Sequence, residues 1–223
     1  MDERTHHCAQ FAFLRGDLEG AQVELADGLL IGPDVKARAG VGLLLVERAA
    51  EAFAEQGFHG ASLRGIAREA GVDHSTLVHH FGNKVGLLTA VLDWHDQQAI
   101  PDDLPEVITP EIVLTGFVAT ARRNQQFPGL VQLLSTMSAE AAATNYPART
   151  FSQRRHGLIV GVIASTIHEQ QVGGIVSNDA PAQQQAIEIV AAWERMQVYD
   201  ALHPGEVDVP AFVERVMRGA FGL

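Results

Sequence analysis

Residues 68–81, REAGVDHSTLVHHF, decide how the first part of this chain is expected to fold. Gly71 interrupts a helical pattern, and a second pattern begins two residues later, after Asp73. Glycine readily adopts the left-handed conformation that ends a helix, and aspartate is a favoured N-cap. The stretch therefore predicts two short helices joined by a tight turn, which is the layout of a helix-turn-helix.

The second of these short helices has an apolar side and a polar side. The residues expected to turn inward, against Leu45, Ala49 and Phe53 of a preceding helix, are Ile66, Ala67, Val72, Leu77 and Phe81. The side chains left outside are those of His74, Ser75, Thr76, His79 and His80. A short helix with such donors and acceptors can enter the DNA major groove and bind base edges and phosphates.

The rest of the chain also has helical periodicity, and no strand-like alternation of useful length interrupts it. Helices are predicted over residues 41–57, 63–70, 73–80, 84–98, 110–126, 128–143, 147–172, 181–202 and 209–220. The fold class is therefore all-α, with about nine helices. Residues 1–35 have no clear period and are expected to form a loosely attached, disordered N-terminal extension. Pro101 and Pro105 mark the boundary between a helix-turn-helix domain (36–98) and a helical C-terminal domain (99–223).

Composition limits the kinds of protein that fit. The net charge is -11, but residues 33–98 carry six Lys or Arg against eight Asp or Glu, so most of the excess acid lies elsewhere. That distribution permits DNA binding without indicating it. The one cysteine, Cys8, rules out an internal disulfide. No apolar run approaches the roughly 20 residues that span a bilayer, so a cytoplasmic protein is expected, without a membrane partner.

A lysine at the start of a helix gives a separate indication of an anion. Lys84 lies in the first turn of its predicted helix, where the helix dipole disfavours a cation, and Val85 and Gly86 supply no acid. A DNA phosphate docked at that terminus would account for the lysine. A solvated surface lysine is the alternative.

The run VERAAEAFAEQGFHGASLRGIAREAGVDHSTLVHHFGNKVGLLTAV resembles the tetracycline-repressor (TetR) family of transcriptional regulators. Its family-like positions are Ala49, Phe53, Gly57, Phe58, Ser62, Ile66, Ala67, Ala70, Gly71, Val72, Thr76, Leu77, His80, Phe81, Lys84, Leu87 and Leu88. The resemblance implies a ligand-responsive repressor that binds operator DNA as a homodimer. Val78 departs from the family pattern, which usually has a phosphate-contacting tyrosine there.

The resemblance also implies roles for individual residues. Phosphate contacts are expected from Ser62, Thr76, His80 and Lys84, with Arg38 and Arg64 as further contributors. Base contacts are expected from His74, Ser75 and His79. The implied C-terminal domain would bind a small, mostly apolar effector and form the dimer.

Two sets of C-terminal residues are candidates for these tasks. The effector pocket is expected to be lined by Phe117, Phe127, Leu134, Met137, His156, Ile163 and Trp193. The dimer interface is expected to use Ile189, Val190, Trp193, Met196, Phe212, Val213, Val216 and Met217. Either set could instead be ordinary monomer core. Arg154 and Arg155, which precede His156, could form an anion site or a solvated turn of helix.

Competing classes have less support. The sequence has no GxSxG nucleophile motif, no phosphate-binding glycine loop followed by Lys-Ser/Thr, and no HExxH motif, so the chain is not expected to be an enzyme. The histidine clusters lack cysteine partners and convergent spacing, so neither a metal nor another cofactor is expected. The remaining alternative is a helical interaction or small-molecule-binding protein that has lost strong DNA binding.

Overall fold

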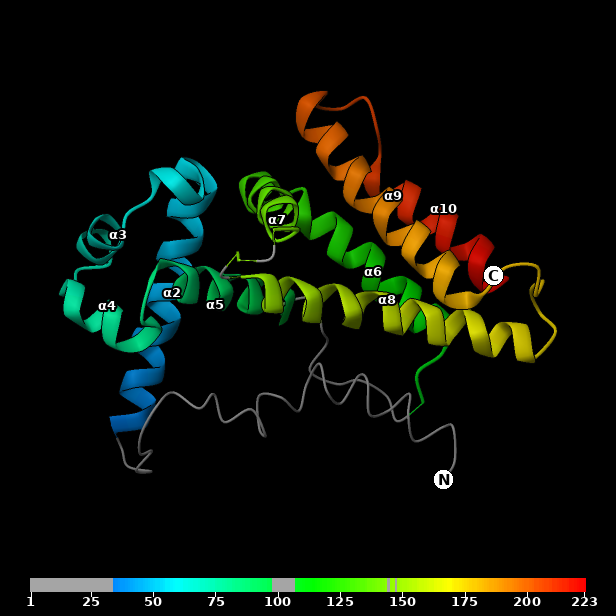
Figure 1. Ribbon diagram of the computed structural model, residues 1–223, viewed down its shortest axis with the longest axis horizontal. Coiled ribbons are helices and arrows are strands. Elements are labelled where there is room, and N and C mark those ends of the chain that lie inside the picture. Colours follow the sequence, from blue (N-terminus) through cyan, green and yellow to red (C-terminus); the bar gives the residue numbers. More distant parts are fainter. Residues whose placement is uncertain (1–33, 98–106, 144, 147) are drawn as a thin grey trace.

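The computed structural model describes residues 34–97, 107–143, 145–146 and 148–223, and this part of the chain forms only helices and connecting turns (Figure 1). The helices are α2 (Asp34–Gly60), α3 (Leu63–Glu69), α4 (His74–Phe81), α5 (Lys84–Gln97), α6 (Pro110–Asn124), α7 (Pro128–Glu140), α8 (Arg149–Val172), α9 (Ala182–Leu202) and α10 (Val209–Phe221). The predicted all-α fold is confirmed for the described residues. The predicted extension lies outside them up to residue 33.

The helix ends in the first part of the chain follow local rules. Gly57 has a φ of 68° within α2, where the chain kinks. The Ser62 hydroxyl caps α3 by accepting a hydrogen bond from the Gly65 N–H at 3.0 Å. Gly71 and Gly82 adopt φ values of 69° and 70° at the ends of α3 and α4. Asp73 occupies the N-cap position of α4 as expected, but its side chain makes no capping hydrogen bond.

A first hydrophobic cluster lies under the helix-turn-helix. The predicted inward residues Leu45, Phe53, Ile66 and Leu77 are all buried in it, together with small side chains such as Ala67. The same cluster contains residues from beyond the predicted domain boundary, namely Leu130, Leu133, Leu134 and Met137 of α7 and Ala148. Helix α7 therefore completes the core on which α2–α5 are supported.

The contact between α2 and α7 is close enough to involve the two backbones. A Cβ atom placed on Gly129 would lie 2.5 Å from Cα of Ala54 and would overlap its carbonyl oxygen. Glycine at this position therefore lets the first turn of α7 lie directly against α2.

A second hydrophobic cluster joins α6, α8, α9 and α10. Its most buried members include Ile163, Ile167, Met217 and Phe221. Figure 1 shows α2–α5 on one side of the molecule, α9 and α10 on the other, and the long α8 running from beside α5 toward the far end. No helix in the described part of the chain is long and apolar enough to cross a membrane.

Candidate nucleic-acid interface and internal cavity

Helix α4 presents polar side chains on the surface and anchors itself with apolar ones. Leu77 is fully buried, whereas His74, Ser75 and His79 are exposed. Thr76 and His80 are partly buried, and the His80 ring lies beside Phe81, with centroids 5.9 Å apart. The structure thus brings the five predicted polar residues together on one short, rigidly supported helix.

The surroundings of Lys84 differ from the sequence expectation. Its Nζ donates a hydrogen bond to the His59 carbonyl at 3.4 Å and lies 4.5 Å from the centre of the Phe58 ring. Partial burial in this position lowers the pKa of Lys84. The lysine therefore connects the start of α5 to the end of α2, which accounts for it without a bound anion.

The start of α5 is also better capped than the sequence suggested. The Asn83 side-chain oxygen accepts hydrogen bonds from the N–H groups of Val85 at 2.9 Å and Gly86 at 3.0 Å. These are two of the N–H groups that a docked phosphate was expected to use. Because Asn83 already satisfies these two N–H groups, the phosphate contact predicted for Lys84 would rest on its ammonium group.

The other predicted phosphate-binding residues lie on α2 and at the start of α3. Ser62 and Arg64 are exposed, and the Ser62 hydroxyl is already the cap of α3. Arg38 belongs to α2, but its side chain lies outside the described structure. Val78, which replaces the tyrosine usual in the TetR family, is partly buried.

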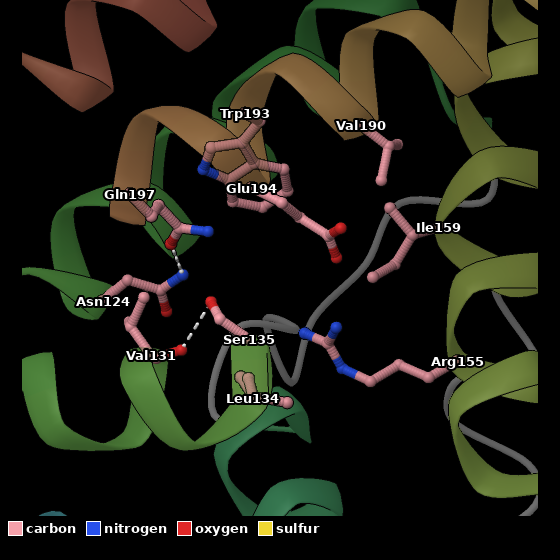
Figure 2. Close-up of a pocket in the computed structure, with 10 residues that line it drawn as sticks. All are labelled: Asn124, Val131, Leu134, Ser135, Arg155, Ile159, Val190, Trp193, Glu194 and Gln197. Atoms are coloured by element: carbon pink, nitrogen blue, oxygen red, sulfur yellow. Dashed lines mark hydrogen bonds between the residues drawn. The ribbon is translucent and has the colours of Figure 1, made fainter. Parts of the chain in front are cut away.

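An internal cavity lies where the two hydrophobic clusters meet (Figure 2). It is small and opens to solvent, with a cavity volume of about 30 Å³, the space of one or two water molecules. Four helices line it: Asn124 comes from α6, Val131, Leu134 and Ser135 from α7, Arg155 and Ile159 from α8, and Val190, Trp193, Glu194 and Gln197 from α9. Leu134 belongs to the first cluster, whereas Val190 and Trp193 belong to the second.

Half of the residues that line this cavity are polar or charged. The Asn124 amide donates a hydrogen bond to the Gln197 side-chain oxygen at 2.5 Å. Among the described residues, neither the Asn124 side-chain oxygen nor the Trp193 indole N–H has a hydrogen-bond partner, although both atoms are buried. The cavity therefore contains polar groups whose hydrogen-bonding capacity the described side chains do not satisfy.

Two ion pairs adjoin the cavity. The His156 ring contacts a carboxylate oxygen of Glu194 at 2.8 Å through Nε2 and the Ser152 carbonyl at 2.9 Å through Nδ1. Both ring nitrogens thus face acceptors, which favours the doubly protonated ring. The hydrogen bond to Glu194 raises the pKa of His156, against the opposing effect of burial. The second pair joins Arg155 to Asp96 of α5.

Only part of the predicted effector pocket coincides with this cavity. Leu134 and Trp193 line it, and His156 holds the lining residue Glu194. The remaining four predicted residues, Phe117, Phe127, Met137 and Ile163, do not line it. Phe117 packs edge-on against Trp193 and Phe127 against His95, while Met137 and Ile163 are core residues of the first and second clusters.

The lining of this cavity is more polar than the predicted effector pocket, because it includes Asn124, Ser135, Arg155, Glu194 and Gln197. The sequence signal for a polar site here is the Arg154–Arg155–His156 run, which is compatible with an anion site or with a solvated turn of helix. The structure divides that run: Arg155 lines the cavity, and the more exposed Arg154 pairs with Asp93 at 3.4 Å.

The predicted dimer residues are also divided by the structure. Val190, Trp193, Val213 and Met217 are buried within a single protomer, because the apolar faces of α9 and α10 close the second cluster. Ile189, Met196, Phe212 and Val216 are only partly buried. The large apolar side chains that α9 leaves exposed are those of Ile187, Tyr199 and Leu202. No cluster of three potential metal ligands occurs among the described residues.

Comparison with known proteins agrees with the helix-turn-helix. Residues 45–91 match the family described as "Bacterial regulatory proteins, tetR family". The HTH-type transcriptional regulator UidR of Escherichia coli K12 is 34% identical over 56 residues, which cover 25% of this chain. The alignment spans only 29% of the length of UidR.

Solved structures extend the similarity to most of the fold. Salmonella enterica GusR superposes with a TM-score of 0.60 at 18% identity, covering 82% of this chain and 96% of GusR. Thermus thermophilus FadR, a TetR-family repressor solved with lauroyl-CoA, superposes with a TM-score of 0.54 at 18% identity, covering 82% of this chain and 94% of FadR. At these identities the superpositions show the fold. The likeness to the tetR family of bacterial regulatory proteins therefore extends over the helix-turn-helix in sequence and over most of the chain in fold.

Proposed function

We propose that this protein is a homodimeric, DNA-binding transcriptional regulator that a small molecule releases from its operator. The observation that carries the proposal is that α4 is anchored by the fully buried Leu77 and presents three polar side chains, those of His74, Ser75 and His79, on its exposed side. A polar helix held in this way can enter the major groove. In a dimer, the two copies of α4 would have to meet half-sites roughly 34–36 Å apart.

In this proposal the residues on and around α4 have different tasks. His74, Ser75 and His79 contact base edges, because they are the exposed members of the helix. Ser62, Arg64, Thr76, His80 and Lys84 contact phosphates, with Arg38 of α2 as a further contributor. Since the Ser62 hydroxyl oxygen accepts from Gly65, its hydrogen remains available for donation to a phosphate.

The proposed dimer uses the outer sides of α9 and α10. Ile187 and Leu202 are 51% and 67% exposed, and they lie near opposite ends of α9. Partly buried Phe212 and Val216 could extend this surface onto α10. Two such helices from each protomer would form a four-helix bundle.

The proposed effector site is the internal cavity, and its lining favours a polar molecule. FadR of Thermus thermophilus, which has a similar fold, was solved with lauroyl-CoA. Here Arg155, Glu194 and Gln197 offer hydrogen bonds, while Ile159 and Val190 supply apolar contacts. Ligand sites commonly combine an apolar wall with a few polar groups that fix orientation.

The test is binding of the purified protein to DNA from upstream of its own reading frame, by fluorescence anisotropy at about 50 mM and about 200 mM salt. His79→Ala removes an exposed α4 ring, and His168→Ala removes an exposed ring of α8 as the matched control. We expect salt-sensitive binding that weakens about fivefold or more in His79→Ala, since a base contact contributes about 1–3 kcal/mol. The His168→Ala variant should bind within about twofold of wild type.

The competing function is a helical interaction or ligand-binding protein without strong DNA binding. Val78 and the net charge of -11 favour this alternative. Absence of saturable binding at both salt concentrations would support it and overturn the regulator. As a regulator, the protein would act in the cytoplasm.

A further inference from the structure

Arg155 joins the C-terminal helices to the helix that follows α4. Its Nε and Nη2 atoms donate to the two carboxylate oxygens of Asp96, at 2.6 Å and 3.1 Å. Asp96 lies near the end of α5, and α5 is separated from α4 only by Gly82 and Asn83. A two-pronged arginine–carboxylate pair fixes orientation as well as distance. Arg155 therefore holds the far end of a helix whose near end carries the DNA-facing unit.

The same guanidinium lines the cavity. Figure 2 shows Arg155 reaching from α8 toward the space between Ser135, Ile159 and Glu194. No hydrogen bond to its Nη1 atom is formed by the residues that the structure describes. One edge of Arg155 is thus engaged by Asp96, and an anion bound at the other edge would share its single positive charge and weaken its hold on Asp96.

We propose that Arg155 couples the cavity to the DNA-binding helices, because a bound molecule and Asp96 compete for its guanidinium. The inference rests on the proposed function. The matching effector carries a carboxylate or a similar anionic acceptor, the chemistry that a guanidinium binds most specifically. Binding would draw Arg155 away from Asp96, release the end of α5, and change the spacing of the two α4 helices in a dimer.

The pair is well placed for this task, because both members are held in a charged state. Burial alone would raise the pKa of Asp96, but the guanidinium of Arg155 and the adjacent His95 ring outweigh it and bring the pKa to about 2. The carboxylate is therefore ionised at any physiological pH. Its release then depends on competition for Arg155, and not on protonation.

A neighbouring ion pair supplies a matched control. Asp93 and Arg154 join the same two helices at 3.4 Å, but both side chains are about half exposed. Neither of them lines the cavity. If any ion pair between α5 and α8 controlled DNA binding, loss of either pair would weaken DNA affinity. If Arg155 is the coupling residue, only loss of the Asp96–Arg155 pair should weaken it.

The experiment compares Asp96→Asn with Asp93→Asn in the full-length protein. DNA affinity is measured on the upstream fragment, and amide hydrogen exchange of α4 and α5 is measured without DNA. We expect Asp96→Asn to weaken DNA binding about fivefold or more, the lower end of typical allosteric coupling. It should also speed exchange in both helices, whereas Asp93→Asn changes neither quantity more than about twofold.

A second variant guards against a folding defect. Arg155→Lys keeps the positive charge but loses the two-pronged geometry, so it should weaken DNA binding less than Asp96→Asn. Wild-type behaviour of Asp96→Asn, or equal losses in Asp96→Asn and Asp93→Asn, would overturn the coupling. If wild type itself binds no DNA, the proposed function fails, and hydrogen exchange in α4 alone decides the coupling.

Discussion

Replacing Gly129 by alanine should strongly destabilise the protein. The new Cβ would lie 2.5 Å from Cα of Ala54 and closer still to its carbonyl oxygen, whereas ordinary contacts begin at 3.4 Å. The backbones of α2 and α7 would therefore have to separate by at least about 0.9 Å. Leu130, the next residue of α7, is fully buried in the first cluster. Because overpacking a filled core typically costs 1–3 kcal/mol, we expect a loss of about 3 kcal/mol, slightly reduced by the better helix propensity of alanine.

Gly116→Ala is the matched control, since Gly116 lies in the middle of α6 and a Cβ there would meet no atom within 4 Å. The same chemical change should therefore stabilise the protein by about 0.5–1 kcal/mol. Urea denaturation followed by circular dichroism gives both values. A Gly129→Ala variant as stable as wild type would refute the close packing of α7 on α2.

Two further predictions concern α9. The folded-state pKa of His156 is raised through its hydrogen bond to Glu194, so its contribution is complete below the unfolded pKa of about 6.5 and is lost as pH rises through the folded value. Urea denaturation at pH 6 and pH 9 should show wild type losing about 0.5 kcal/mol more than His156→Gln, and an equal loss would exclude this contribution. Ile187→Arg should give a monomer in analytical ultracentrifugation, because it places a charge in the proposed interface. Its helicity by circular dichroism should stay unchanged, because Ile187 is exposed on the protomer surface. A persistent dimer would place the interface elsewhere.

The helix-turn-helix could be predicted from sequence because its signals are local. Gly71, Gly82 and Ser62 determine where helices begin and end within a few residues, and Leu77 identifies the inward side of α4. Lys84 shows where local reasoning fails. Its partners, Phe58 and the His59 carbonyl, lie some 25 residues earlier in the chain, beyond the reach of helix-terminus rules.

The cavity could not be predicted because its residues come from four helices. Asn124 and Gln197 are 73 positions apart but form a hydrogen bond, and nothing near either residue indicates the other. The amphipathic pattern of α9 likewise predicts which of its residues form an apolar face, but it does not indicate whether that face packs within the protomer or against a second copy. Val190 and Trp193 therefore fitted a dimer interface equally well until tertiary packing placed them in the protomer core.

The sharing of the first hydrophobic cluster by α7 limits how this protein can be recombined with others. A chimaera joined after residue 98 would separate Phe53 and Leu77 from the α7 side chains that share their core. The separated helix-turn-helix would expose apolar surface and would lose the close contact of α2 with the α7 backbone at Gly129. A helix-turn-helix unit that is transferred to another protein must therefore include residues 128–140 as well, or receive an equivalent helix from the acceptor protein.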